Sequence, residues 1–159
     1  MNIDIIAVGK IKEKFIEDGI QEYVKRLKPY CNINIIEVND EKAPESLSDK
    51  EKISVMQRES VKIVDKIRKG SFIISLCIEG RQMDSVEFAR YIEDVMTAGN
   101  SNITFVIGGS LGLHNDIKSM SGLKLSFSKM TFPHQLMRLI LIEQIYRAFK
   151  IMKGEPYHK

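Results

Sequence analysis

ITFVIGGSLG at residues 103–112 and LKLSFSKMTFPH at residues 123–134 each begin as a short apolar strand and end in a loop. Short apolar runs bounded by glycine or proline are typical of buried strands. The loops combine glycines, small hydroxyl side chains and apolar groups, which suits a ligand site better than a plain surface turn. These two segments therefore predict two strands whose ends contribute to one binding pocket.

Strand and helix patterns alternate outward from these segments along the whole chain. Strands are predicted at 3–9, 33–38, 72–78, 103–107 and 123–126, and helices at 13–28, from Ser48 to about Lys69, at 85–98, near 114–121 and at 133–152. Ser48 and Glu51 have the spacing of a capping box, and Asp84 can cap the third helix. Because strands separated by helices form crossover units, we expect an α/β fold, a mostly parallel sheet with helices on both faces. No repeat or long linker divides the chain, so residues 1–159 should form a single domain.

The composition of the 159 residues, 43% apolar and 28% charged, is that of an ordinary globular protein. The N-terminal segment carries an acid where a signal peptide carries positive charge, and no apolar run is long enough to cross a bilayer. We therefore expect a cytoplasmic protein without a membrane segment. Cys31 and Cys77 have no CxxC spacing and no nearby histidine, so we expect reduced thiols and no metal site.

Positive charge is concentrated at the C-terminal end. Residues 124–159 hold seven Lys or Arg and two acids, although the net charge of the whole chain is only +3. A basic face beside a pocket suits a polyanion such as RNA or DNA. Solvated helix charges would give the same composition, so charge alone leaves both interpretations open.

Three loops should meet at one edge of the sheet, because ligands of parallel sheets bind beyond the carboxyl ends of the strands. These loops are Leu76–Glu79, Gly108–Gly112 and Phe127–Thr131. The glycine loop matches neither a phosphate-binding P-loop nor GxGxxG, and a tight turn without a ligand explains it equally well. The loop after the last strand could hold a flat ring between apolar groups, or it could simply pack into the core.

The helix predicted at 133–152 is apolar around most of its circumference. Half of it can pack on the sheet, and a homodimer is the economical way to cover the rest, with full burial inside one chain as the alternative. Of the three histidines, His134 is the best placed to take part in chemistry. His158 lies in the terminal segment Pro156–Lys159, which would be frayed unless it folds over the pocket.

Three motifs in this order resemble the SPOUT class of RNA methyltransferases, and most closely its ribosomal RNA large subunit methyltransferase H group. The motifs are Leu76–Gly80, Phe105–Leu113 and Leu125–Tyr146, followed by the terminal sequence PYHK. The resemblance extends over the whole chain. It implies a deep C-terminal trefoil knot, an exception to the rule that chains do not thread their own loops, with the knot and cofactor site within about residues 72–155.

The resemblance also implies a function. The chain would be an obligate homodimer that binds S-adenosylmethionine in the knot and methylates N3 of a pseudouridine in 23S ribosomal RNA, on the large subunit or the whole ribosome, without a metal. Carried over by position, the cofactor contacts would be Leu76, Gly108, Phe127, Ser128, Lys129, Met130, Thr131 and Phe132. The RNA contacts would be Lys129, Arg138, Tyr157, His158 and Lys159.

N3 of pseudouridine becomes a nucleophile only as its proton leaves. Arg138, Lys129 or the basic tail could stabilise the resulting anion. His134 or His158 could accept the proton, with bulk water as the alternative. Two departures from the family pattern matter: Cys77 stands where an acid often occurs, and Lys159 lacks the planar fork that an Arg would offer a phosphate.

Two other functions fit the sequence less closely. One is a non-catalytic RNA-binding homodimer with a vestigial pocket, which would not bind S-adenosylmethionine. The other is a nicotinamide-dependent oxidoreductase, but the chain lacks GxGxxG and an acidic ribose partner about twenty residues later.

Overall fold

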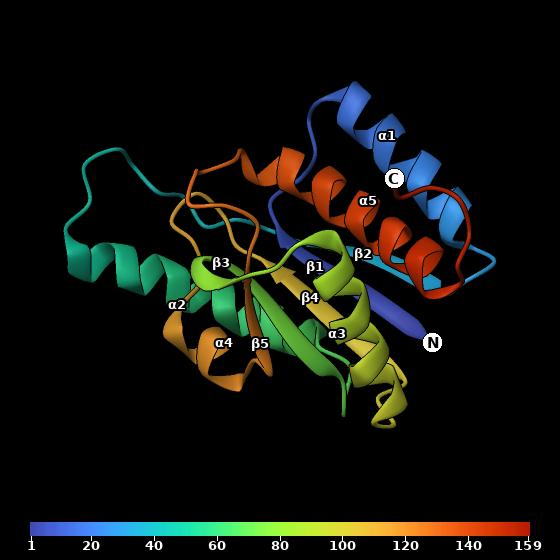
Figure 1. The fold of residues 1–159 in the computed structure, drawn as a ribbon. Helices are drawn as coiled ribbons and strands as arrows, with labels where there is room; N and C mark the ends of the chain where they lie inside the picture. The colour runs from blue at the N-terminus through green and yellow to red at the C-terminus, as the bar shows by residue number, and fades with distance from the viewer.

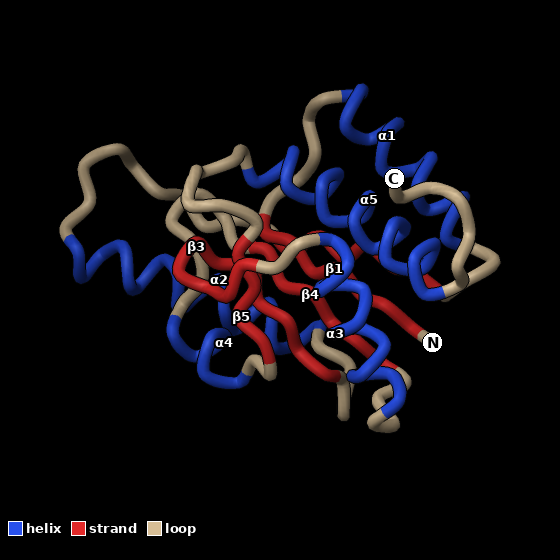
Figure 2. The backbone as a smooth tube through the Cα atoms, viewed as in Figure 1, coloured by secondary structure: helices blue, strands red, loops and turns tan.

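Helices cover both faces of a single sheet in the computed structural model, which describes residues 1–159 (Figures 1 and 2). The elements follow one another as β1 (Asn2–Val8), α1 (Lys14–Leu27), β2 (Asn32–Val38), α2 (Asp49–Lys66), β3 (Phe72–Gln82), α3 (Ser85–Thr97), β4 (Asn102–Ile107), α4 (Asn115–Met120), β5 (Leu123–Ser126) and α5 (His134–Met152). The five strands lie in the order β2-β1-β4-β3-β5 and every pair is parallel. The predicted α/β class is confirmed.

The alternation of side chains along β1 sends apolar groups to both faces of the sheet. Ile3, Ile5 and Ala7 pack with α1, α3 and α5, whereas Ile6 and Val8 pack with residues of α2 and α4. Figure 1 shows the same division, with α1, α3 and α5 on one side of the strands and α2 and α4 on the other. The central strands are consequently buried on both faces, as their continuous apolar runs predict.

The helix starts that the sequence predicts are confirmed where a cap specifies them. The Ser48 side chain accepts a hydrogen bond from the Glu51 backbone N–H, and the Glu51 carboxylate accepts one from the Ser48 backbone N–H. Asp84 and Glu87 form the same reciprocal pair at the start of α3. Each box satisfies two backbone donors that a helix start leaves without partners.

β3 is longer than the sequence predicts. It does not end at Ile78 but reaches Gln82, because Arg81 pairs with Leu125 and Gln82 with Ser126 after an irregularity that follows Leu76. Gly80 lies within this stretch, so close to β5 that a Cβ atom there would stand 2.7 Å from the carbonyl carbon of Lys124. The polar residues of this stretch hide its strand character, which comes from pairing with β5.

α5 lies between α1 and α3 on one face of the sheet (Figure 1). Leu141, Ile142 and Ile145 are buried, and no apolar side chain of α5 is fully exposed. The flanking helices therefore account for much of the apolar surface that the sequence assigned to a second copy. None of the helices combines the length and apolar character needed to span a bilayer.

Candidate cofactor site

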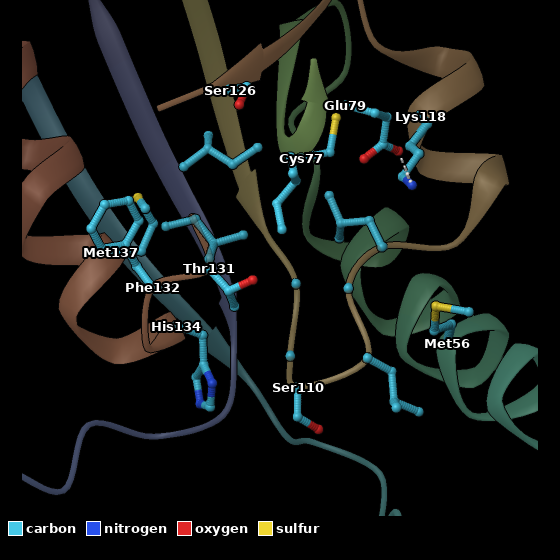
Figure 3. Close-up of a pocket in the computed structure, with 18 of the residues that line it drawn as sticks. Met56, Cys77, Glu79, Ser110, Lys118, Ser126, Thr131, Phe132, His134 and Met137 are labelled. Carbon is cyan, nitrogen blue, oxygen red and sulfur yellow. Dashed lines mark hydrogen bonds and ion pairs between the residues drawn. The ribbon is translucent and has the colours of Figure 1, made fainter. Parts of the chain in front are cut away.

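A cavity of about 540 Å³ lies at the carboxyl edge of the sheet, a volume typical of small-molecule sites. The structure brings the three predicted segments together: Leu76–Glu79, which lie within the extended β3, and the loops that follow β4 and β5 each form part of its wall. The N-terminal half of α2 adds Ile53 and Met56, which the sequence did not indicate (Figure 3). The lining mixes apolar side chains with main-chain and hydroxyl groups, so it can enclose a ring and bind polar atoms at its edge.

The glycine loop after β4 depends on the absence of side chains. A Cβ atom on Gly108 would lie 2.7 Å from the carbonyl carbon of Gly112, which real contacts do not allow. Gly112 has a φ of +86°, and its N–H donates to the Gly109 carbonyl at 3.0 Å. The loop thus presents backbone to the cavity at close range.

The loop after β5 carries most of the predicted cofactor residues. Phe127, Ser128, Met130, Thr131 and Phe132 all line the cavity, Leu76 lines it from β3, and Gly108 lines it from the loop after β4. The hydroxyl of Ser128 accepts the Met130 N–H at 3.0 Å, which fixes the turn. Lys129 is exposed and is not among the lining residues, so the structure does not bring its side chain to the cavity.

His134 begins α5 and lines the cavity, as predicted for a group that takes part in chemistry. Figure 3 shows its imidazole at the same end of the cavity as Ser110, away from the ion pair between Glu79 and Lys118. Burial lowers the pKa of His134, and the nearby Arg138 guanidinium lowers it further. A neutral imidazole at the edge of the cavity can accept a proton at neutral pH.

Arg138 does not reach the cavity or the solvent. Its side chain is 1% exposed; Nη2 donates to the carbonyls of Val8 at 2.9 Å and Gly9 at 2.7 Å, and Nη1 lies 2.8 Å from a Glu37 oxygen. It occupies the same helical stripe as Leu141 and Ile145, which faces the sheet. The expectation that Arg138 contacts RNA or the reacting nitrogen is wrong in this structure, because its guanidinium is turned inward.

The C-terminal tail is ordered, and it folds onto its own α5. The Tyr157 hydroxyl donates to Glu143 at 3.0 Å, while its ring packs edge-on against Tyr146 and beneath the Arg147 guanidinium. Burial raises the pKa of Tyr157, and the hydrogen bond to Glu143 raises it further. The half-buried Tyr157 ring is therefore already packed against side chains of its own chain.

His158 and Lys159 remain exposed, but not at the cavity. His158 Nδ1 lies 3.4 Å from an Arg147 nitrogen and borders a second hollow of about 380 Å³ between α3 and α5. The structure therefore does not bring His158 and His134 together within one chain.

An ion pair that the sequence did not reveal stands at the cavity wall opposite His134. Glu79 follows the buried part of β3 and pairs with Lys118 of α4 (Figure 3). Lys118 lowers the pKa of Glu79, so the carboxylate is charged at neutral pH. The two residues lie far apart in the sequence, and no local pattern connects them.

Comparisons with known proteins agree with this architecture. The family described as "Predicted SPOUT methyltransferase" matches residues 1–158. Proteins named ribosomal RNA large subunit methyltransferase H from Bacillus cytotoxicus and Bacillus anthracis are 55% and 54% identical to this chain, over the full length of both sequences.

A solved structure shares the fold. It is described as a probable methylase family protein from Haemophilus influenzae Rd KW20, and it matches 99% of this chain and 70% of its own with a TM-score of 0.55 and 14% identity. The family model matches nearly the whole chain, and relatives of the same length are 54–55% identical to it. The similarity therefore lies in the sequence as well as in the fold. The chain belongs to the SPOUT methyltransferase family.

Proposed function

We propose that this chain methylates N3 of a pseudouridine in 23S ribosomal RNA, using S-adenosylmethionine, as a homodimer acting on the assembled ribosome. The observation that carries the proposal is the cavity walled by the three predicted segments, in a chain that is 55% identical over its full length to a protein named for large-subunit ribosomal RNA methylation. The nucleotide, the nitrogen and the ribosomal context rest on the family resemblance of the motifs at 76–80, 105–113 and 125–146.

The residues at the cavity fit the cofactor. Leu76, Gly108 and the loop Phe127–Phe132 would hold it, because they offer apolar faces for an adenine ring and backbone groups for its edge. The charged pair Glu79 and Lys118 suits a molecule that carries both positive and negative groups. When bound, S-adenosylmethionine supplies an electrophilic methyl group.

The proposal includes a knot, in which the C-terminal end of the chain is threaded through an earlier loop. Leu125 of β5 pairs with both Leu76 and Arg81 of β3, so the four residues between these two positions form an irregular bulge opposite β5. The chain then leaves β5 at the edge of the sheet and continues into α5, between α1 and α3 (Figure 1). This course is the one expected if the final segment passes through a loop of the preceding chain and forms a trefoil knot.

His134 is the best-placed proton acceptor of this chain. Its imidazole lines the cavity and its lowered pKa keeps it neutral near pH 7. Removal of the N3 proton as the methyl group arrives gives the nitrogen the electron pair that it needs. Positioning of the nitrogen in line with the methyl group is the remaining task of the pocket.

The tail supports the homodimer. His158 and Lys159 do not line the cavity of their own chain, and a homodimer would offer them a route to the cavity of a second copy. Two copies would also offer the RNA a larger surface than one.

Calorimetry and methyl transfer together test the function. We expect S-adenosylmethionine to bind, and labelled methyl groups to reach whole ribosomes faster than large subunits or free 23S RNA. Absence of cofactor binding would reject the enzyme and favour a non-catalytic RNA-binding protein. Mass analysis of the labelled nucleoside identifies the base and the nitrogen.

A further inference from the structure

The loop between β1 and α1, residues 9–13, emerges at the carboxyl edge of the sheet, beside the cavity. Gly9 has a φ of +88°, and a Cβ atom placed on it would lie 3.7 Å from Nε2 of His134. Lys12 is near enough to contribute to the lowered pKa of His134. The loop therefore borders the imidazole that lines the cavity, although none of its residues forms part of the cavity wall.

Side chains of β2 and α5 hold this loop in place. Arg138 donates to the Gly9 carbonyl at 2.7 Å, and the Glu37 oxygen that pairs with Arg138 also accepts the Ile11 N–H at 2.9 Å. The Lys12 N–H donates to the Gln135 side chain at 2.9 Å. These contacts use the backbone of the loop and leave its lysine side chains free.

Lys10 and Lys12 are both exposed, and neither pairs with an acid, whereas Lys14 pairs with Asp18. The loop that borders His134 thus carries two unpaired ammonium groups, in the part of the sequence that is not basic overall. The negative charge of Asp40 opposes them, since it raises the pKa of His134 whereas Lys12 lowers it. Exposed ammonium groups on flexible stems bind phosphates as point charges and tolerate varied geometry.

We propose that Lys10 and Lys12 bind backbone phosphates of the RNA next to the target nucleotide, and that Arg138 and Glu37 are positioning residues that hold their loop. This inference rests on the proposed function. It assigns the buried Arg138 an indirect part in RNA binding through the loop that its guanidinium fixes. It also adds two basic residues of the N-terminal part of the chain, Lys10 and Lys12, to those of the basic C-terminal third.

The test compares two double variants of the full chain. Lys10→Gln with Lys12→Gln removes the proposed contacts, and Lys28→Gln with Lys69→Gln removes the same charge at the opposite edge of the sheet, from two exposed lysines without ion pairs. The substrate is whole ribosomes from a bacterial strain that lacks its own relative of this enzyme. We expect the first variant to raise the KM for ribosomes on the order of tenfold and to leave cofactor binding unchanged.

Salt dependence adds a second readout. For the Lys10 and Lys12 variant, the slope of log affinity for ribosomes against log salt should fall by about 0.7 to 0.9 per lysine. Equal effects of the two double variants, or no effect of the first, would overturn the proposal. Ribosome binding measured on filters needs no catalysis, so it tests these lysines even if no methyl transfer is found.

The positioning role has its own variant. Glu37→Gln makes the chain more positive, which by charge alone should strengthen binding to RNA. Because it weakens the hold on the loop, we expect the KM for ribosomes to rise instead, with the affinity for S-adenosylmethionine unchanged. An unchanged or lower KM would show that the Arg138 and Glu37 pair does not position the lysines.

Discussion

Arg138 is the largest side chain that the fold buries completely, and it joins three segments of the chain. Its hydrogen bonds reach the end of β1 and the turn at Gly9, and its charge is balanced by Glu37 of β2. Burial lowers the pKa of the guanidinium, and Glu37 opposes that shift. A buried charge of this kind is retained only where its partners are well placed.

Replacement of Arg138 by Met should therefore destabilise the chain. The change leaves the carbonyls of Val8 and Gly9 without a donor, while Glu37, which is 38% exposed, can be solvated. We expect a loss of about 2–4 kcal/mol in the free energy of unfolding, measured by urea denaturation. Arg90→Met, at an exposed position without an ion pair, is the control and should change it by less than about 0.5 kcal/mol. Equal losses would contradict the structural role of Arg138.

The pH dependence of methyl transfer should report His134. Burial and Arg138 place its pKa below the ordinary value of 6.5, so the base form persists when the pH falls to that value. We expect the rate at saturating substrate to stay constant around pH 7 and to decline only below pH 6.5. His134→Gln, which keeps a polar side chain but cannot titrate, should lower the rate by about 10²–10⁴ and remove this acid limb. A variant with the same acid limb as the unaltered chain would exclude His134 as the base.

At the scale of elements, the sheet edge is built from loops that depend on close backbone contacts. The glycine loop after β4 and the irregular stretch of β3 each place a glycine where a Cβ atom would meet backbone at 2.7 Å. Neither contact can be relieved by rotating a side chain. The addition of even a methyl group at either glycine should therefore displace the backbone at this edge of the sheet.

Gly108→Ala tests this sensitivity. The added methyl group collides with the backbone of Gly112, so the loop must move and the cofactor wall with it. We expect the Kd for S-adenosylmethionine to rise on the order of tenfold or more by calorimetry. Ser110→Ala in the same loop removes one hydroxyl and adds no volume, and it should have a much smaller effect. A Kd for Gly108→Ala within twofold of the unaltered chain would contradict the argument, provided that urea unfolding shows both variants folded.

Local signals predicted the elements well, and contacts between distant segments explain the differences. Ser48 and Asp84 specify helix starts through residues three positions away, so the sequence alone locates them. The extension of β3 to Gln82 depends on pairing with β5, and the ion pair of Glu79 with Lys118 depends on the packing of α4. Arg138 was misjudged for the same reason. Its residue type indicates a surface base, whereas the rotation of α5 on the sheet turns it inward.

At the scale of the whole molecule, the three layers concentrate the proposed chemistry at one edge. The loops after β1, β4 and β5 and the irregular stretch of β3 after Leu76 all lie there, because every strand runs in the same direction. The tail lies elsewhere, beside α3 and α5, and its exposed end borders the second hollow. One chain thus supplies the proposed cofactor cavity and a loop with two exposed lysines, while its basic tail does not line that cavity.

The proposed homodimer can be tested at Ile140, the one apolar residue of α5 that does not pack in or against the core cluster of its own chain. Ile140 is only partly buried and lines the second hollow, and unlike Leu136 or Leu139 it does not pack against the core cluster. If α5 lies at the interface, Ile140→Glu places a charge within it at little cost to the fold. Light scattering at micromolar concentration should then give twice the chain mass of 18.2 kDa for the unaltered protein and the single mass for the variant.

Val61→Glu, at a 67% exposed position of α2, is the matched control and should remain dimeric. Because the proposed activity uses two copies, the Ile140→Glu variant should also lose methyl transfer to ribosomes while it still binds S-adenosylmethionine. A monomeric unaltered chain would reject the dimer itself. A dimeric Ile140→Glu variant would instead place the interface away from this side of α5, and the proposed approach of the tail to a second cavity would need another surface.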